Sequence, residues 1–101
     1  MARKDTTIVL KFGGSSVADV KCIERISKIA LKEAQEHNVI VVTSAMGKST
    51  NQLIDLANQA CPGCSGRELD MLLATGELVS ISLTAMTIQR LGHAAVSLTG
   101  W

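Results

Sequence analysis

Aromatic residues are almost absent from this sequence. Phe12 and Trp101 are the only two, and there is no tyrosine. Single strands and flipped bases of nucleic acids are commonly held by stacking on aromatic side chains, and such platforms are nearly missing here. Ten basic and nine acidic residues give a net charge of +1, with no basic block to follow a duplex backbone. The composition therefore gives little support to nucleic-acid binding.

Long apolar runs and cysteine pairs are also scarce. Residues 78–88 are strongly apolar, but Glu77 and Arg90 bracket them at a span too short for a bilayer. The N-terminal MARKDTTIVL does not resemble a signal peptide. Three cysteines, an odd number, suit a reducing compartment better than a disulfide scaffold. With 47% hydrophobic and 19% charged residues in a chain of 101, the sequence predicts one small globular domain, soluble and cytoplasmic.

Short apolar runs alternate with amphipathic segments along the chain. Strands are expected at residues 8–12, 39–42 and 94–98, with helices over 18–36, 49–60 and 67–91. Capping signals precede each helix. They are Ser16 with Asp19, Ser49 with Gln52, and Ser65 with Glu68. This alternation predicts an α/β fold of three αβα layers around a parallel sheet.

Two segments have patterns that indicate deep burial. Residues 39–42 are all β-branched, which suits a central strand covered on both faces. The helix at 67–91 is apolar nearly all round, so we expect it to be buried on most sides.

A turn of small residues follows each expected strand, at residues 11–16, 44–47 and 99–101. The carboxyl ends of parallel strands meet at one edge of a sheet, where ligands bind in such folds. In the first turn, Lys11 precedes Gly13 and Gly14, a combination that lets backbone N–H groups and a positive charge approach a phosphate. The sequence therefore predicts an anion site at this rim. The alternative is a turn whose glycines only permit the bend.

Two nucleotide-binding motifs are excluded. The pair Gly13-Gly14 does not extend to GxGxxG. Gly47-Lys48-Ser49 resembles the end of a Walker A loop, but Val42 occupies the position of the leading glycine.

Glu77 is unusual because an ionised carboxylate on an apolar helix is costly unless it is paired. It is either a partly exposed residue, an ion-pair partner of Arg67 or Arg90, or an acceptor for a substrate ammonium group. Gly76 before it would let a ligand or another backbone come close.

Cys61 and Cys64 form a CxxC motif between two expected helices. A thioredoxin-like motif follows a strand, and a zinc site would need two further ligands that no suitable spacing supplies. A plain interhelical loop is the favoured interpretation, with a thiol redox site as the weaker one.

Four blocks in order resemble the aspartokinases of the amino-acid kinase superfamily. They are VLKFGGSSV at residues 9–17, VVTSAMGKST at 41–50, RELDMLLATGE at 67–77 and SLTGW at 97–101. Members of this family phosphorylate the side-chain carboxylate of L-aspartate with ATP, giving 4-phospho-L-aspartate for lysine, threonine and methionine synthesis. The resemblance implies the same reaction here.

The resemblance also implies roles for particular residues. Lys11 would be catalytic, and Thr50 and Glu77 would bind aspartate. The positions that would hold the ATP phosphates are Lys11, Phe12, Gly13, Gly14, Ser15, Ser44 and Gly47. Mg²⁺ would arrive with ATP and have few direct protein ligands, so no metal-ligating residue is expected.

The chain has less than half the length that this family needs. We therefore expect residues 1–101 to be an incomplete N-terminal part of the kinase domain, without the adenine pocket or the regulatory ACT domains, and inactive alone. The alternative is a non-catalytic piece that binds nucleotide or self-associates. Unpaired sheet edges and an unpartnered helix face favour a homo-oligomer or self-association.

Overall fold

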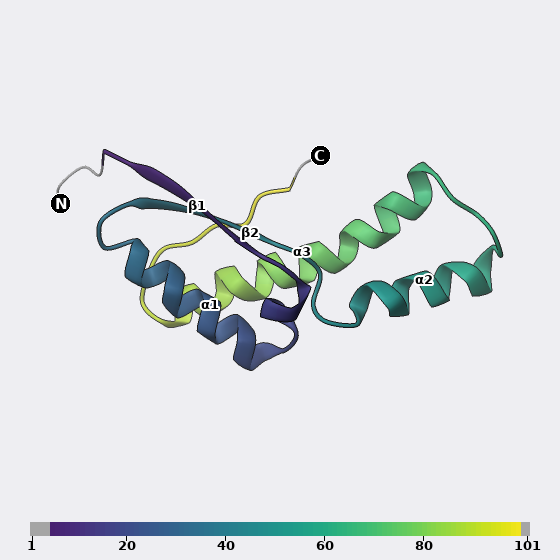
Figure 1. Cartoon of the computed structure of the whole chain (residues 1–101), viewed down its shortest axis with the longest axis horizontal. Helices are drawn as coiled ribbons and strands as arrows, with labels where there is room; N and C mark the ends of the chain where they lie inside the picture. The colour runs from purple at the N-terminus through teal and green to yellow at the C-terminus, as the bar shows by residue number, and fades with distance from the viewer. Residues whose placement is uncertain (1–4, 100–101) are drawn as a thin grey trace.

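The structure is a computed structural model that describes residues 5–99. Its elements are β1 (Thr7–Phe12), the 3-10 helix η1 (Gly14–Val17), α1 (Val20–Glu33), β2 (Asn38–Thr43), α2 (Ser49–Ala60) and α3 (Arg67–Arg90) (Figure 1). β1 and β2 are parallel neighbours, in a register that runs from Thr7 opposite Asn38 to Phe12 opposite Thr43. The predicted α/β class with a parallel sheet is confirmed.

The two-stranded sheet is covered on one face. Ile8, Leu10 and Phe12 are half-buried on the side where α1 and α3 lie, below the strands in Figure 1. The opposite face carries exposed side chains. They are Val9, Lys11, Ile40 and Val42. The expectation that residues 39–42 are covered on both faces is therefore wrong for the described chain, because Ile40 is 52% exposed and no element of residues 5–99 packs over that face. The described residues form two of the three expected layers.

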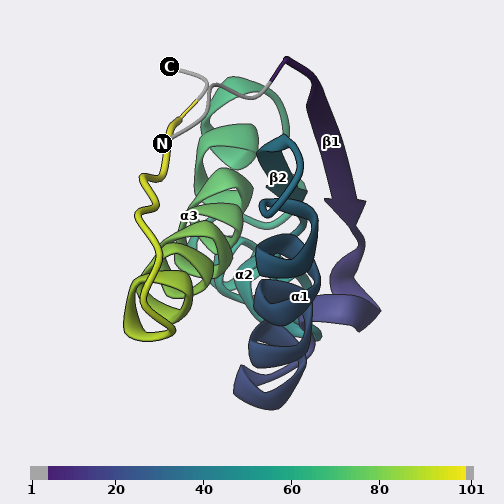
Figure 2. The same cartoon turned by 90° about the vertical axis from the view of Figure 1, so that its left-hand side faces the viewer.

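Residues 94–98, the expected third strand, form no strand. The segment runs on the β2 side of the sheet, away from β1 (Figure 2). The Gln89 side chain donates a hydrogen bond to the carbonyl of Ala95 (2.9 Å), and the His93 ring contacts the carbonyl of Ala94 (2.8 Å). These contacts engage carbonyls that a strand ladder would use. A groove of about 680 Å³ separates the segment from β2 and α3.

The core lies directly beneath the turn after β1. Val17, Ile23 and Ile26 are buried, and Phe12, Met46 and Leu83 pack against them. Val17 belongs to η1 and is fully buried, so the residues that hold the fold together also hold this turn in place.

α1 begins later than its sequence pattern predicts. Its N-cap is Asp19, whose carboxylate accepts a hydrogen bond from the backbone N–H of Cys22 (2.8 Å). The prediction that Ser16 caps this helix is wrong, because Ser16 lies within η1 and its N–H donates to the carbonyl of Gly13 (3.0 Å). The bond from Cys22 stabilises the ionised carboxylate and lowers the pKa of Asp19.

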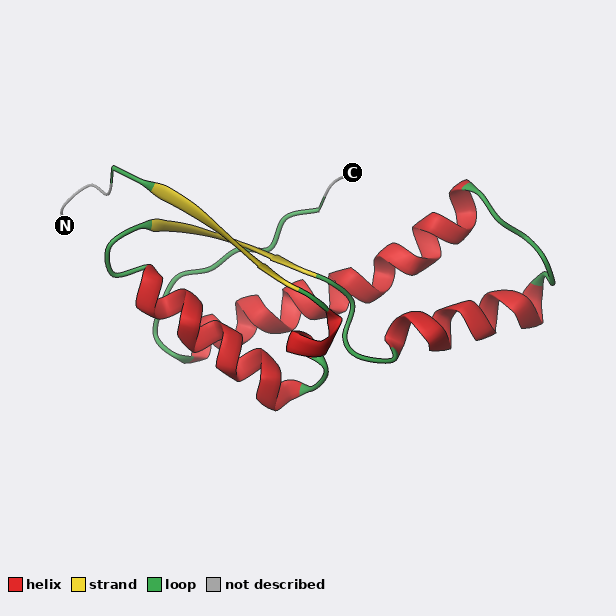
Figure 3. Ribbon diagram, in the orientation of Figure 1, coloured by secondary structure: helices red, strands yellow, loops and turns green. Residues whose placement is uncertain are grey.

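α2 and the N-terminal part of α3 form a hairpin that extends away from the sheet, and the rest of α3 returns beneath the strands beside α1 (Figure 3). The predicted span of α2 is confirmed, and α3 ends one residue earlier than expected. Neither predicted capping box forms. Lys48 stands at the N-cap of α2 and Gly66 at that of α3, and neither cap has a side-chain hydrogen bond.

α3 is buried along one stripe only, not on most sides as expected. Gly76, Ser80, Thr84 and Ile88 recur every four residues and form the buried stripe. In contrast, Val79 is 52% and Met86 61% exposed. Small and hydroxyl side chains in this stripe let α3 approach β2 and α1 closely, and Leu83 also packs against the core. Within residues 5–99, α3 alone is long and apolar enough to cross a membrane, a test that core helices also pass.

Candidate functional site

Residues 11–16, the first rim turn, and residues 44–47, the second rim turn, lie against each other. The parallel register sets Lys11 opposite Val42, so both strands end at the same edge. The N–H of Ser44 donates to the carbonyl of Phe12 (3.1 Å), and the N–H of Gly47 donates to the carbonyl of Gly14 (3.3 Å). The structure therefore brings together the first two turns of the predicted rim.

Gly47 is required by the backbone of the second rim turn. Its φ of +38° lies in the left-handed region, and an added Cβ would stand 3.1 Å from the carbonyl oxygen of Ala18. The space around Gly13 is open, in contrast to that around Gly47, since a Cβ added at Gly13 would meet nothing within 4 Å. The first rim turn thus leaves open space in front of its backbone, which a ligand could occupy.

Lys11 lies at the end of β1 on the open face of the sheet. Its side chain is exposed, and among residues 5–99 it forms no ion pair. Ser15 is also exposed, whereas Phe12 packs into the core. The side chain of Phe12 is therefore directed into the protein, and only its backbone is at the rim. Lys11 is the first residue of the first rim turn and supplies its positive charge.

Ser80 of α3 holds the start of the second rim turn. It is fully buried, and its Oγ lies 2.6 Å from the carbonyl oxygen of Ser44, to which it donates. Ser80 Oγ also lies 3.2 Å from Thr43 Oγ1, and it donates to the carbonyl oxygen of Glu77 at 3.0 Å. Sequence reasoning missed Ser80. The available signal was a hydroxyl residue one turn after Gly76 on an apolar helix.

Gly76 allows the second rim turn to touch α3. A Cβ at this position would stand 3.0 Å from the Cβ of Ala45 and 3.3 Å from Cδ1 of Leu53. A ligand or another backbone was expected close to Gly76, but the structure places the side chains of Ala45 and Leu53 there. Gly76 and Ser80 together fix the turn that carries Ser44 and Gly47.

Glu77 forms no ion pair among residues 5–99. Arg67 pairs with Glu68, and Arg90 pairs with Glu24 of α1 (3.7 Å), so the ion-pair interpretation of Glu77 is wrong. Its side chain is exposed and lines the groove beside β2. Thr50 is exposed in the first turn of α2, three residues after Gly47. Both residues are therefore open to a ligand near the second rim turn.

Of the third predicted turn, residues 99–101, the structure describes only Thr99. Thr99 lines the same groove as Thr43 and Glu77, but it follows a segment that is not part of the sheet. Gly100 and Trp101 lie outside the described residues. Over the described range, no cluster of three or more His, Cys, Asp or Glu side chains could hold a metal ion.

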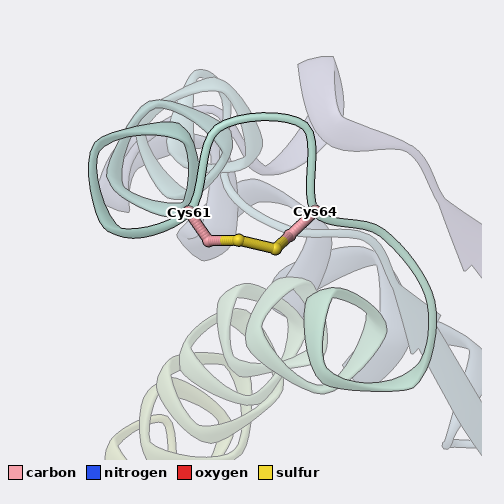
Figure 4. The surroundings of a disulfide bond; sticks show 2 residues. All are labelled: Cys61 and Cys64. Atoms are coloured by element: carbon pink, nitrogen blue, oxygen red, sulfur yellow. A yellow bond between two sulfur atoms is a disulfide. The ribbon is translucent and has the colours of Figure 1, made fainter.

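Cys61 and Cys64 are joined by a disulfide at the tip of the α2–α3 hairpin (Figure 4). The favoured interpretation of this segment as a plain loop is thus wrong in one respect, because the loop carries a covalent link. Cys22 on α1 is a free, half-buried thiol.

The chain belongs to the amino acid kinase family, whose model matches residues 6–100. It is 52% identical to the aspartokinase of Geobacillus stearothermophilus over 95 residues, which are 93% of this chain and 23% of that protein. It is 54% identical to aspartokinase 2 of Bacillus subtilis, with the same coverage of both chains.

The fold is also similar to the crystal structure of aspartate kinase from Synechocystis. The TM-score is 0.88 at 48% identity, over 94% of this chain and 16% of that chain. These findings confirm the resemblance and the fold class. The chain spans about a quarter of the length of the curated relatives, 23% for the two named above.

Proposed function

We propose that this chain supplies the phosphate-binding and part of the aspartate-binding surface of an aspartate kinase. The reaction transfers the γ-phosphoryl group of ATP to the side-chain carboxylate of L-aspartate, giving 4-phospho-L-aspartate and ADP. One observation carries the proposal: two glycine-containing turns are hydrogen-bonded to each other at the ends of parallel strands, where Lys11 is exposed. Relatives named aspartokinase, about half identical in sequence, support the choice of substrate.

Phosphoryl transfer asks a protein mainly for positioning and for neutralisation of negative charge. The ammonium group of Lys11 supplies the charge. Backbone N–H groups of the two rim turns hold the phosphate oxygens, with the turns fixed by the core and by Ser80. The proposed ATP-phosphate positions are Lys11, Phe12, Gly13, Gly14, Ser15, Ser44 and Gly47. Phe12 contributes through its backbone only, since its side chain packs in the core.

L-Aspartate has an ammonium group and two carboxylates to be recognised. The carboxylate of Glu77, which forms no ion pair among residues 5–99, accepts hydrogen bonds from the ammonium group, and the hydroxyl of Thr50 donates to a carboxylate. Mg²⁺ would arrive with the nucleotide and would supply neutralisation of the negative charge on the phosphates.

The proposed activity belongs to a longer kinase polypeptide, because the chain spans 23% of the length of its curated relatives and the adenine pocket is expected outside it. The isolated 101-residue chain should show no aspartate-dependent ATP turnover. Cytoplasmic location, a role in lysine, threonine and methionine synthesis, and a homo-oligomeric state belong to the same proposal.

A second candidate is a non-catalytic piece that self-associates. It is favoured by the exposure of Val79, Met86, Ile40 and Val42, large apolar side chains that association would cover. Light scattering of the purified chain tests it, and a stable monomer at high concentration would argue against it.

A chimera tests the main proposal directly. The 95 matched residues of Bacillus subtilis aspartokinase 2 are replaced by those of this chain, and acyl phosphate is trapped with hydroxylamine in the presence of ATP and L-aspartate. We expect aspartate-dependent product. Lys11→Ala should lower its rate at least about 100-fold, the effect of losing one preorganised charge contact.

Lys32→Ala is the matched control, since Lys32 is an exposed lysine in the last turn of α1, before the start of β2. It should leave the rate unchanged. A folded chimera that makes no acyl phosphate would refute the proposed function. An unchanged rate in Lys11→Ala would remove Lys11 from the mechanism.

A further inference from the structure

The tip of the α2–α3 hairpin is a tight turn built by its own backbone. The N–H of Cys64 donates to the carbonyl of Cys61 (3.2 Å), and Gly63 has a φ of +77°. Proline at the second position and left-handed glycine at the third are the preferences of a type II turn. The Cα atoms of the two cysteines are 5.6 Å apart, within the usual range for a disulfide. The turn therefore places the two thiols within bonding reach (Figure 4).

Both cysteines are accessible to solvent. Every residue from Cys61 to Gly66 is exposed, and a Cβ added at Gly63 would meet nothing within 4 Å. Cys61 caps the C-terminus of α2, with its N–H bonded to the carbonyl of Ala57 (2.8 Å). The sulfur atoms are thus held by ordered backbone in a place that small thiols can reach, which is the condition for selective exchange.

We propose that Cys61 and Cys64 form a reversible dithiol–disulfide site that exchanges with low-molecular-weight thiols. In reduction, an external thiolate attacks one sulfur, a mixed disulfide forms, and the other cysteine leaves as a thiolate that takes up a proton. A second external thiolate then attacks the external sulfur of the mixed disulfide, its bond to the cysteine breaks, and that cysteine leaves as a thiolate that also takes up a proton. The protein gains two electrons and two protons, and one small-molecule disulfide is released. Oxidation is the reverse.

The site controls how firmly the two helices are joined. In the oxidised form, a covalent link closes the turn between the end of α2 and the segment before α3. In the reduced form, the tip is held by backbone contacts alone. Reduction should therefore increase amide exchange in residues 61–66 and leave α1 unchanged.

The first experiment measures the equilibrium itself on the full 101-residue chain. The protein is equilibrated in glutathione redox mixtures, quenched with acid, alkylated with a maleimide and weighed by intact mass spectrometry. We expect two alkyl groups to be lost together from Cys61 and Cys64, with a mass lower by two hydrogens in the unalkylated chain. Cys22→Ser should show the same transition. Independent glutathionylation of each cysteine, or links between separate chains, would overturn the proposal.

The second experiment tests the role of the turn. Gly63→Ala places a side chain at positive φ, and relaxation of the turn in the dithiol form should shift the equilibrium roughly fivefold or more toward the dithiol. Gly92→Ala is the matched control. Gly92 also has a positive φ (+95°) with nothing within 4 Å of an added Cβ, and it lies beyond the far end of α3. It should leave the equilibrium unchanged. An equal shift in both variants, or none in Gly63→Ala, would contradict the inference.

Discussion

Replacing Ser80 by alanine should weaken the contact between α3 and the second rim turn. Ser80 is fully buried, and its hydroxyl donates to the carbonyl of Ser44 at 2.6 Å while lying 3.2 Å from the hydroxyl of Thr43. The variant removes both contacts and leaves the hydroxyl of Thr43, itself 7% exposed, without this partner. The carbonyl of Ser44, which is part-buried, loses the hydroxyl of Ser80 as its hydrogen-bond donor.

The magnitude follows from the cost of an unsatisfied buried group, about 1–3 kcal/mol. Alanine also raises helix propensity by up to about 0.5 kcal/mol, which partly offsets the loss. We therefore expect the free energy of unfolding to fall by about 1–2.5 kcal/mol. Urea unfolding followed by circular dichroism measures this, as a lower midpoint at an unchanged slope.

Ser82→Ala supplies the control. Ser82 lies two residues further along the same helix and is exposed, so its replacement gives the same gain in propensity without losing a buried contact. Its effect should stay within about 0.5 kcal/mol. Equal stabilities of the two variants would refute the reasoning, because the hydrogen bonds of Ser80 would then contribute nothing. Amide resonances of residues 44–47 should shift in Ser80→Ala only.

Three other substitutions have defined outcomes. Gly76→Ala should destabilise the fold by up to about 2 kcal/mol, because contact with the Cβ of Ala45 at 3.0 Å outweighs the gain in helix propensity. Ile23→Ala, at a side chain only 1% exposed, should cost about 2–5 kcal/mol in urea unfolding. The pKa of Asp19 is lowered from 3.8, so its carboxylate stabilises α1 above that pH and loses this effect as the pH falls through its lower folded pKa. Asp19→Asn should lack this acid-dependent loss in thermal unfolding between about pH 5 and pH 2.

Each of these predictions has its own check. Ala45→Gly should restore the stability of Gly76→Ala if the clash is real, and additive effects would exclude it. Ile29→Ala, on the same helix but 42% exposed, should cost much less than Ile23→Ala. Parallel pH profiles of the wild type and Asp19→Asn would show that the Asp19 carboxylate is not linked to folding.

The sequence predicts the elements whose signals are local. Apolar periodicity predicts α2 within its observed bounds and α3 within one residue, and β-branched runs predict both strands. Small residues after each strand predict the two rim turns. The two turns meet because parallel strands end at one edge, so that part of the candidate site also follows from pattern and topology.

Features that depend on a tertiary partner could not be predicted. Residues 94–98 have a strand-like pattern, but pairing needs a neighbour, and Gln89 and His93 instead engage the carbonyls of this segment. Ser16 and Asp19 are both competent caps, and only the formation of η1 decides between them. The role of Ser80 depends on which backbone α3 meets, a fact that lies outside the sequence of the helix.

The stripe of small residues on α3 has a mechanical consequence. Gly76 packs closely against Ala45, and one helical turn later the hydroxyl of Ser80 donates to the carbonyl of Ser44. A packing contact and a hydrogen bond therefore hold the same short backbone segment. A displacement of residues 44–47 is therefore coupled to a displacement of α3. Glu77 lies between the two contact positions on α3 and is displaced with the helix. The second rim turn and the carboxylate of Glu77 are therefore expected to move together.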